Sequence, residues 1–319
     1  MTDDALKMCL ASQPVPLISV LMPAFNAEDH IAEAIQSILR QTFSDFELII
    51  LNDGSTDRTS EIINGFADQR IRKIELRQNQ GLVNARNQLV TTARGRYIAF
   101  LDSDDIAFPD RLQKQFRFLE TGAADVCGGA HFSLYESTGR LKASKERYRD
   151  ADIRALMTIY SPLCNPAVMG RAELFKKHPY QAGQDSAEDY SLWQTLALAG
   201  YRFANLRDKL ITYRIHRKQT TQIKNTETNS VFNQSRLRYL SGLSIAPELC
   251  PRPMGFLERL KLALPFMWQL NNRIPGVSVN ANYQIYSRFQ VRGSRIWMPL
   301  TRLERLMVAC IASLKGSCT

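Results

Sequence analysis

The feature that most constrains the fold is an alternation of short apolar runs with amphipathic stretches along the first part of the chain. LISVLM (17–22) and FELIIL (46–51) are continuous apolar segments of strand length. Such runs are typical of strands that are buried on both faces. Between them, the apolar residues of 31–39 recur at helical spacing, so this segment is predicted to be an amphipathic helix.

The same alternation continues downstream. A helix is predicted to begin at the Ser55-Thr56 pair, whose hydroxyls suit a capping position, and another at Pro109. Strands that alternate with helices imply right-handed crossovers and a mostly parallel sheet, that is, an α/β fold. The remaining predicted elements are a helix over 82–93 and strands over 71–76, 97–101 and 125–132.

Ligands of such sheets bind beyond the carboxyl ends of the strands. Three polar segments stand at those ends: PAFN after the first strand, NDGSTD after the second and DSDD after the fourth. The fold class therefore predicts that residues far apart in the sequence meet at one edge of the sheet, where a ligand binds.

The segment DSDD places three carboxylates within four residues: Asp102, Asp104 and Asp105. Adjacent carboxylates repel one another, so a strand that delivers them to a sheet edge favours a compensating cation. Hard oxygen ligands suit Mg2+ or Mn2+, which bind through one or two carboxylates and the phosphates of a substrate. The alternative is a surface turn that caps the helix at Pro109.

The other two segments suit a nucleoside. Asp53 follows a buried strand and offers acceptors to the N–H groups of a base, although Asp-Gly is also an ordinary turn. The segment after the first strand offers backbone groups that could line a nucleoside pocket, with Pro23, Ala24, Asn26 and Glu28 as its candidate residues.

Together, VLMPAFNAEDHI, QTFSDFELIILNDGSTD and ARGRYIAFLDSDD closely resemble the family-2 glycosyltransferases with the GT-A fold, over about residues 17–120. The resemblance implies an inverting enzyme that uses a nucleoside-diphosphate sugar, most often a UDP-sugar, with Mn2+ or Mg2+. It implies that Asp53 contacts the base. It also implies that Asp102, Ser103 and Asp104 lie at the ribose, the diphosphate and the metal, with Asp104 a direct metal ligand and Asp105 in support.

A second acidic pair lies in SAEDYSLW (186–193), which resembles the family's ED motif at the start of a helix. An acceptor hydroxyl must lose a proton as it attacks the anomeric carbon, and a carboxylate within reach can take it. We therefore predict Asp189 as the general base and Glu188 as its helper or an acceptor-site residue. The alternative is a helix N-terminus with acidic residues that favour its dipole.

Two further residues are candidates. His216 in YRIH, which resembles the family segment that closes over the diphosphate, is predicted to ligate the metal or donate to the leaving phosphate; a structural histidine is the alternative. Arg86 in GLVNARNQ is predicted to hold the nucleotide or to pair with a neighbouring acid, and Asn165-Pro166 to border the acceptor site.

The charge divides the chain. Residues 201–319 hold 19 Lys and Arg against 5 Asp and Glu, whereas residues 1–200 hold 22 against 26. We predict three parts: a tail (1–16), a GT-A domain (17–222) and a basic, mainly helical extension (223–319). Apolar stripes in 256–270 and 296–315 predict either a contact with anionic membrane, or packing on the catalytic domain or a second subunit.

No uncharged apolar run reaches the length of a spanning helix, and the acidic start does not look like a secretory signal. These features predict a cytoplasmic protein, at most peripheral on the inner face of the membrane. Despite a pI of about 9.4, no nucleic-acid-binding module is recognisable, so we expect no nucleic acid partner.

The expected partners are the donor and a glycan or lipid-linked acceptor of surface polysaccharide or glycolipid biosynthesis. The chain has no QxxRW motif, which favours the addition of a single sugar. Two other functions are considered. A sugar nucleotidyltransferase would carry a glycine-rich loop after the first strand, which PAFNAEDH does not provide. A catalytically inactive sugar-nucleotide-binding scaffold would not need the retained carboxylates.

Overall fold

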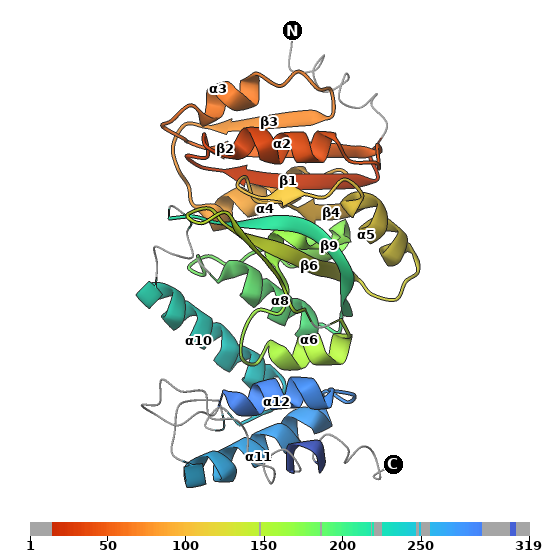
Figure 1. The fold of residues 1–319 in the computed structure, drawn as a ribbon, viewed down its shortest axis with the longest axis vertical. Coiled ribbons are helices and arrows are strands. Elements are labelled where there is room, and N and C mark those ends of the chain that lie inside the picture. The colour runs from red at the N-terminus through yellow and green to blue at the C-terminus, as the bar shows by residue number, and fades with distance from the viewer. Residues whose placement is uncertain are drawn as a thin grey trace.

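A computed structural model gives the arrangement of the chain (Figure 1). It shows one large sheet with helices on both faces, and a helical C-terminal part at one end of the molecule. The described residues are 15–146, 148–185, 187–217, 219, 225–246, 249, 256–288 and 307–310.

The sheet has nine strands in the order β3-β2-β1-β4-β8-β6-β9-β5, with β7 paired to β6. The first four pair in parallel, so the predicted parallel sheet is confirmed for this half of the molecule. Ile18 aligns with Phe46 on one side and with Tyr97 on the other. The bounds of these strands are Ile18–Ala24 (β1), Phe46–Asp53 (β2), Ile71–Leu76 (β3) and Tyr97–Phe100 (β4).

The second half of the sheet is mixed. Strand β8 is antiparallel to β4 and β6, β6 is parallel to β9, and β5 is antiparallel to β9. The long pair β6 and β9 brings the C-terminal end of β9 to the same edge as the end of β4. The bounds are Ile106–Ala107 (β5), Val126–Tyr135 (β6), Arg140–Ala143 (β7), Met169–Arg171 (β8) and Phe203–Ile215 (β9).

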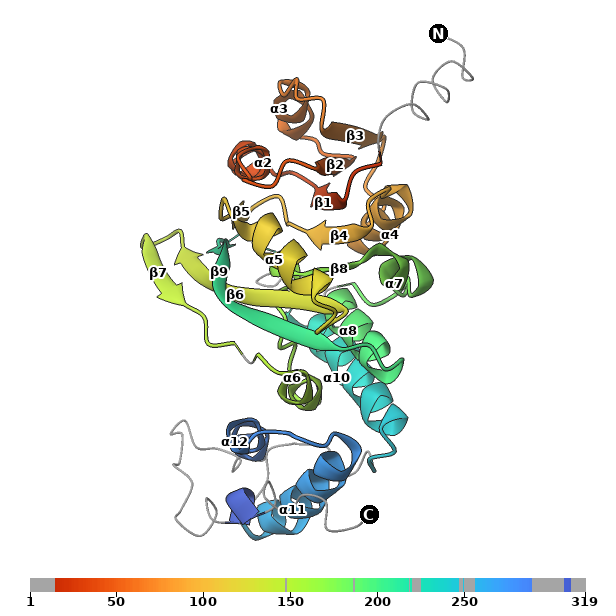
Figure 2. The ribbon, with the colours of Figure 1, turned by 90° about the vertical axis from the view of Figure 1, so that its right-hand side faces the viewer.

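Two apolar cores cover the two faces of the sheet. Alternate residues of β1 point to opposite faces, so Leu21 packs with the side of α4 while Val20 and Met22 pack with the side of α2. Figure 2 shows α2 and α4 on opposite sides of β1. The helices are Ile31–Leu39 (α2), Thr59–Asn64 (α3), Leu82–Thr92 (α4), Arg111–Glu120 (α5), Asp150–Leu156 (α6), Ala172–Lys177 (α7) and Glu188–Leu198 (α8), with a 3-10 turn at Asn165–Ala167.

The helix predicted to begin at Ser55-Thr56 begins four residues later, at Thr59. The prediction that these two hydroxyls cap it is wrong. The Ser55 hydroxyl donates to Oδ1 of Asn52 and accepts from the amide of Asn26 instead. The Ser55 hydroxyl therefore bonds to the end of β2 and to the loop after β1, and it does not cap the helix.

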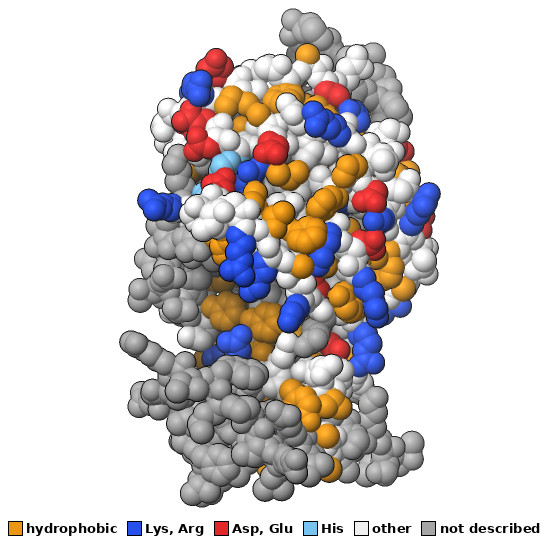
Figure 3. All heavy atoms as spheres, in the orientation of Figure 1, with side chains coloured by type: hydrophobic (Ala, Val, Ile, Leu, Met, Phe, Trp, Pro, Cys, Tyr) orange, Lys and Arg blue, Asp and Glu red, His pale blue; other side chains and the backbone are white. Residues whose placement is uncertain are grey.

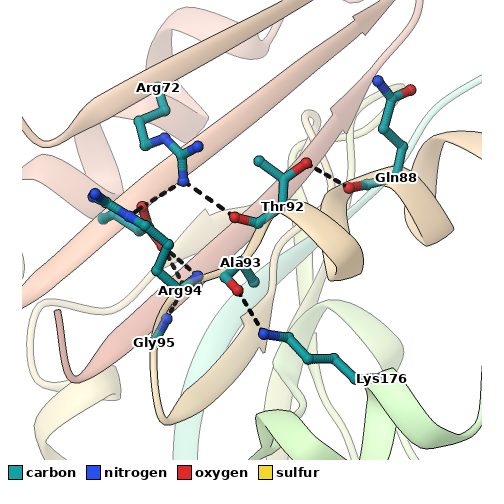
Figure 4. Close-up of polar contacts among 9 residues, drawn as sticks. Arg72, Gln88, Thr92, Ala93, Arg94, Gly95 and Lys176 are labelled. Carbon is teal, nitrogen blue, oxygen red and sulfur yellow. Dashed lines mark hydrogen bonds and ion pairs between the residues drawn. The ribbon is translucent and has the colours of Figure 1, made fainter. Parts of the chain in front are cut away.

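A buried carboxylate fixes the opposite ends of these strands. Glu47 of β2 accepts from Arg72 at 2.9 Å and from Nε of Arg94 at 3.0 Å. Burial opposes ionisation, but these hydrogen bonds lower the pKa of Glu47. Figure 4 shows Arg72 at the carbonyl of Thr92 and Lys176 at the carbonyl of Ala93, just before Arg94. These bonds hold the segment that leads into β4, and they help to position the acidic loop that follows β4.

The C-terminal part is mainly helical, as predicted, and shares a core with the sheet. It consists of α10 (Asn225–Gly242), α11 (Phe256–Arg273) and α12 (Val279–Ser287). Phe232 of α10 stacks on Tyr190 of α8 with ring centroids 4.1 Å apart, and Ser235 donates to Gln194 at 2.6 Å. Next to α12, the Ser278 amide donates to Asp152 of α6 at 2.6 Å.

The apolar stripe of α11 is used for packing. Ala263, Phe266, Met267 and Leu270 are fully buried in the shared core, whereas Trp268 is 58% exposed. This favours the packing alternative for the first of the two stripes. The second stripe, 296–315, lies outside the described residues except for 307–310, where Val308 is buried. Among the described residues, no helix combines the length and the hydropathy needed to cross a bilayer.

Candidate active site

The loops after β1 and β2 interlock by reciprocal hydrogen bonds. Asn26, with φ of +48°, accepts at Oδ1 from the amide of Thr56 at 2.9 Å, and its own amide donates to the Ser55 hydroxyl at 2.9 Å. The amide of Ala27 donates to the hydroxyl of Thr59 at 2.8 Å. The two predicted nucleoside-binding segments therefore form one continuous edge.

Glu28 extends the same contact. Its amide donates to Asp57 at 3.1 Å, and its carboxylate accepts from both the amide and Nε of Arg58 at 3.2 Å. Pro23 and Ala24 are the last residues of β1 and align with β2. Pro23, Ala24 and Asn26 thus line one sheet edge, while Glu28 is engaged with the neighbouring loop.

Asp53 is buried and holds the loop that leads into α4. Its two oxygens accept from the amides of Gln80 at 2.8 Å and Gly81 at 3.0 Å. A carboxylate has further lone pairs, so these bonds leave capacity for a base. In the loop after β1, Phe25 is a 47% exposed aromatic side chain that is not among the predicted site residues. An exposed ring at this edge can stack on a base.

The acidic loop after β4 meets the end of β9. Nε2 of His216 lies 2.9 Å from Oδ2 of Asp104, so the structure brings together two residues predicted to bind the metal. The hydrogen bond to Asp104 raises the pKa of His216. One carboxylate and one imidazole, both partly exposed, provide ligand atoms of the kind that divalent ions accept. Ser103 lies between the carboxylates and is partly buried.

Asp105 has a different setting. It is fully buried, its Oδ1 accepts from the amide of Arg214 at 2.9 Å, and its Oδ2 has no hydrogen-bond partner. Burial, together with the charges of Asp104 and Asp102, raises the pKa of Asp105 well above its usual range. Asp105 thus ties β9 to the acidic loop two residues before His216, which fits a supporting role.

Arg86 lies at the centre of the site and is buried. Its Nη2 lies 3.3 Å from Oδ1 of Asp102, and its Nη1 lies 2.8 Å from Oε1 of Glu188. With its amide turned to face the guanidinium, Asn165 accepts from both Nη atoms at 3.1 Å. The ring of Tyr180 lies 5.6 Å from the guanidinium carbon. Arg86 therefore links the acidic loop to the helix that carries the predicted base.

The pKa values of Arg86 and Asp102 are both raised, which favours the charged form of the arginine and disfavours that of the aspartate. Burial disfavours the guanidinium ion, but the carboxylates of Glu188 and Asp102 outweigh it and raise the pKa of Arg86. For Asp102, burial and the nearby charge of Asp104 prevail over Arg86 and raise its pKa to about 6. Arg86 thus keeps its positive charge among these carboxylates.

Asp189 is the second residue of α8 and is partly exposed. Burial, and next to it the charge of Glu188, raise the pKa of Asp189 to about 7. Glu188, in contrast, is buried against Arg86. The two acids of the predicted pair therefore have different environments, and Asp189 has the pKa that suits proton transfer near neutrality.

Several residues of this region carry no local sequence signal. Asn87 clamps Tyr180 by two reciprocal bonds of 2.9 Å, which seats the ring beside Arg86 although the two are 93 residues apart. His30 and Glu136 lie against His216. Only tertiary pairing places these side chains, so spacing along the sequence could not have indicated them.

Comparison with known proteins bears on this site. The family model described as glycosyl transferase family 2 matches residues 19–178. An uncharacterised glycosyltransferase of Haemophilus influenzae is 33% identical over 227 residues, which are 67% of this chain and 70% of that protein. The residues that match the family model include the loops after β1, β2 and β4.

Two solved structures share the fold. TarS (residues 1–349) of S. aureus in complex with UDP-GlcNAc superposes with a TM-score of 0.58 at 18% identity, covering 84% of this chain and 83% of that one. The mannosyltransferase PcManGT from Pyrobaculum calidifontis, in complex with GDP-Man and Mn2+, gives a TM-score of 0.51 at 15% identity, over 96% and 90%. The chain is thus a GT-A glycosyltransferase that belongs to glycosyl transferase family 2.

Proposed function

We propose that this glycosyltransferase moves one sugar from a nucleoside-diphosphate sugar, a UDP-sugar, to an acceptor hydroxyl with inversion at the anomeric carbon. The observation that carries the proposal is that one sheet edge presents two acidic residues in different environments. Asp104 lies beside His216, and Asp189 stands at the start of α8. Arg86 joins the two through Asp102 and Glu188.

The donor is proposed to lie along the interlocked loops after β1 and β2. There the ring of Phe25 offers a stacking face, Asp53 offers acceptors to the base, and Asp102 faces the ribose. The complex of TarS with UDP-GlcNAc, which has the same fold, supports a donor of this class. Arg86 is buried among acids, which favours the pairing alternative, so we assign it to positioning.

The cation is proposed to be Mn2+ or Mg2+, held by Asp104 and His216 with Asp105 in support. The pairing of carboxylate and imidazole and the unpartnered buried oxygen of Asp105 fit this role. The PcManGT complex contains Mn2+, which supports it further. Such an ion neutralises charge on the leaving diphosphate. From the protein side, Asp105 keeps His216 at the acidic loop through its bond to Arg214.

The reaction is proposed to be a single displacement. Asp189 accepts the proton of the acceptor hydroxyl as its oxygen bonds to the anomeric carbon, and the bond from that carbon to the diphosphate oxygen breaks. A carboxylate with a pKa of about 7 is about half ionised at pH 7, and in its ionised form it can take the proton. Glu188 is proposed to act through Arg86, by holding the start of α8 in place.

The acceptor is proposed to be a surface glycan or a lipid-linked precursor. The net positive charge of residues 201–319 supports an anionic surface or acceptor as the partner. We keep the boundary at residue 222 as a proposal: donor and base lie within 17–222, and 223–319 form the basic extension. A peripheral contact with anionic membrane, or with a second copy, would use exposed groups such as Trp268, because Ala263, Phe266, Met267 and Leu270 of α11 are buried.

The test is transfer or slow hydrolysis with a panel of nucleoside-diphosphate sugars in the presence of Mn2+. A transferase releases the nucleoside diphosphate from one donor or a few, and the released sugar carries the inverted configuration. Release of pyrophosphate from a sugar phosphate and a nucleoside triphosphate would identify a nucleotidyltransferase instead. Tight donor binding with no turnover for any acceptor would identify an inactive scaffold.

A further inference from the structure

Two imidazoles and a carboxylate from three distant segments meet beside the acidic loop. His30 precedes α2, Glu136 follows β6, and His216 follows β9. One ligand atom from each of these residues lies within 4.8 Å of the others, and the ring centroids of His30 and His216 are 4.9 Å apart. Figure 3 shows histidine atoms at the surface of this face, next to acidic side chains.

The geometry of this trio is close to that of a metal site. Three ligand atoms bound to one tetrahedral ion at ordinary lengths lie about 3.4 Å apart. Nε2 of His30 and Oε1 of Glu136 are already 3.3 Å apart, so the third ligand needs only a small movement of His216. The three side chains are partly exposed, which gives an ion access and leaves room for water as a fourth ligand.

The chemistry of the trio differs from that of the acidic loop. Two histidines with one carboxylate form a ligand set that zinc-class ions prefer, whereas Mn2+ and Mg2+ favour oxygen ligands and phosphate. The two sets share one residue, because Nε2 of His216 also lies 2.9 Å from Asp104. An ion held by the trio fixes the His216 imidazole in the geometry of the trio, so it competes with the acidic loop for this side chain.

We propose that His30, Glu136 and His216 form a second divalent-cation site, selective for zinc-class ions, whose occupancy inhibits the enzyme by competing for His216. The inhibitory part rests on the proposed function, in which His216 and Asp104 serve the donor site. The binding part rests on geometry alone.

One nearby cation opposes binding. Nη1 of Arg214 lies 3.6 Å from Oε1 of Glu136. Arg214 also pairs with Glu33 on α2, so its charge is already compensated when Glu136 turns to an ion. With Asp104 close by, the side-chain charges around His30, Glu136 and His216 therefore still favour a bound cation.

Binding is tested with Co2+ on the metal-free full-length protein, because tetrahedral Co2+ has strong visible absorption bands. The wild type should show these bands at one equivalent. His30→Gln and Glu136→Gln should weaken the affinity for Co2+ by about tenfold or more, because each removes a ligand. Asp104→Asn should keep the bands. His131→Gln is the matched control: His131 lies 3.4 Å from Glu146 but belongs to no such trio among the residues that the structure describes.

Inhibition is tested on transfer supported by Mn2+. Zn2+ should inhibit the wild type, and His30→Gln and Glu136→Gln should retain basal activity within about twofold while the inhibition shifts by about tenfold or more. Absence of tetrahedral Co2+ bands, or bands lost in Asp104→Asn and kept in His30→Gln, would overturn the proposal. In both cases the transferase proposal still stands on Mn2+-dependent turnover. Loss of turnover with the Co2+ site intact would instead remove only the proposed function.

Discussion

Nη1 of Arg86 lies 2.8 Å from Oε1 of Glu188, and this buried ion pair connects α4 to the first turn of α8. The same guanidinium reaches Asp102 at the end of β4. The acidic loop after β4 and the first turn of α8 are therefore joined through one buried side chain. A buried pair of this kind does little for net stability, but breaking it leaves an uncompensated charge.

Glu188→Gln is the first expected loss of stability. The substitution leaves Arg86 without its shorter ion pair and with Asp102 at 3.3 Å, so the free energy of unfolding should fall by about 3 kcal/mol. Urea denaturation followed by circular dichroism measures this. Arg72→Gln is a useful comparison, because it breaks one of two arginine bonds to buried Glu47 and leaves Arg94 in place, so it should cost less. An unchanged midpoint for Glu188→Gln would show that the pair is not structural.

Asp189→Asn should have the opposite profile. It keeps the shape but removes the proton acceptor, so turnover should fall by about 100-fold or more while donor binding persists. Because the charge of Glu188 and burial disfavour ionised Asp189, the variant should unfold at no lower temperature than the wild type at pH 8. Near-normal turnover would move the role of base to another carboxylate, Glu188 first.

The pH dependence of the wild type checks the same assignment. A base works only when ionised, so turnover should rise as the pH increases through about 7 and level off above it. The raised pKa means that the folded state holds a proton that the unfolded state loses. The contribution of this group to stability is therefore greatest below its unfolded pKa, and declines as the pH rises to about 7. A rate that is flat from pH 5 to pH 9 would contradict this.

Chelation should abolish transfer, and added Mn2+ should restore it. Asp104→Ala removes the carboxylate next to His216, so it should weaken binding of the nucleoside diphosphate mainly when Mn2+ is present. Calorimetric titrations with and without the ion measure the difference. Asp110→Ala, on an exposed ion pair with Lys114 away from this loop, serves as the control. Equal turnover with and without chelator would leave charge neutralisation to His216 and nearby arginines.

Gly54 and Gly139 provide a matched test of the loop after β2. Both have positive φ, +68° and +65°, so alanine costs about 1–2 kcal/mol at either position. A Cβ at Gly54 would also come within 2.5 Å of the backbone of Gln78, whereas the space around Gly139 is open. Gly54→Ala should therefore lower the thermal midpoint more and weaken donor binding. Equal effects of the two substitutions would show that the loop after β2 accommodates the added Cβ without further loss of stability.

Vesicle co-sedimentation tests the basic extension. The full-length protein should bind anionic vesicles at low salt and release them at high salt, because exposed charges are screened. Trp268→Gln removes the largest exposed apolar group of α11 and should weaken this binding without loss of stability. Val279→Gln, a less exposed apolar position on α12, is the comparison. Failure of the wild type to bind at low salt would leave the extension with a packing role.

The sequence predicted the strands and most helices because their periodicity is local. It placed Asp102, Asp104 and Asp53 at one edge, since parallel strands end together. It did not predict that Arg86 would be buried between Asp102 and Glu188, because α8 stands about a hundred residues downstream and its position depends on the mixed half of the sheet. The start of α3 was predicted too early for a related reason. The Ser55 hydroxyl bonds to Asn52 in β2 and to Asn26 in the loop after β1, so it is not available to cap the helix.

The mutual bonds between Asn26 and the segment Ser55–Thr56 have a kinetic consequence. Each loop holds the other in place through these hydrogen bonds, so this edge is ordered without a bound ligand. A donor that arrives there loses its own freedom but does not have to order the protein as well, which lowers the entropic cost of the encounter. Association at this edge should accordingly resemble docking onto a preformed surface, with discrimination between donors expressed in how quickly they leave.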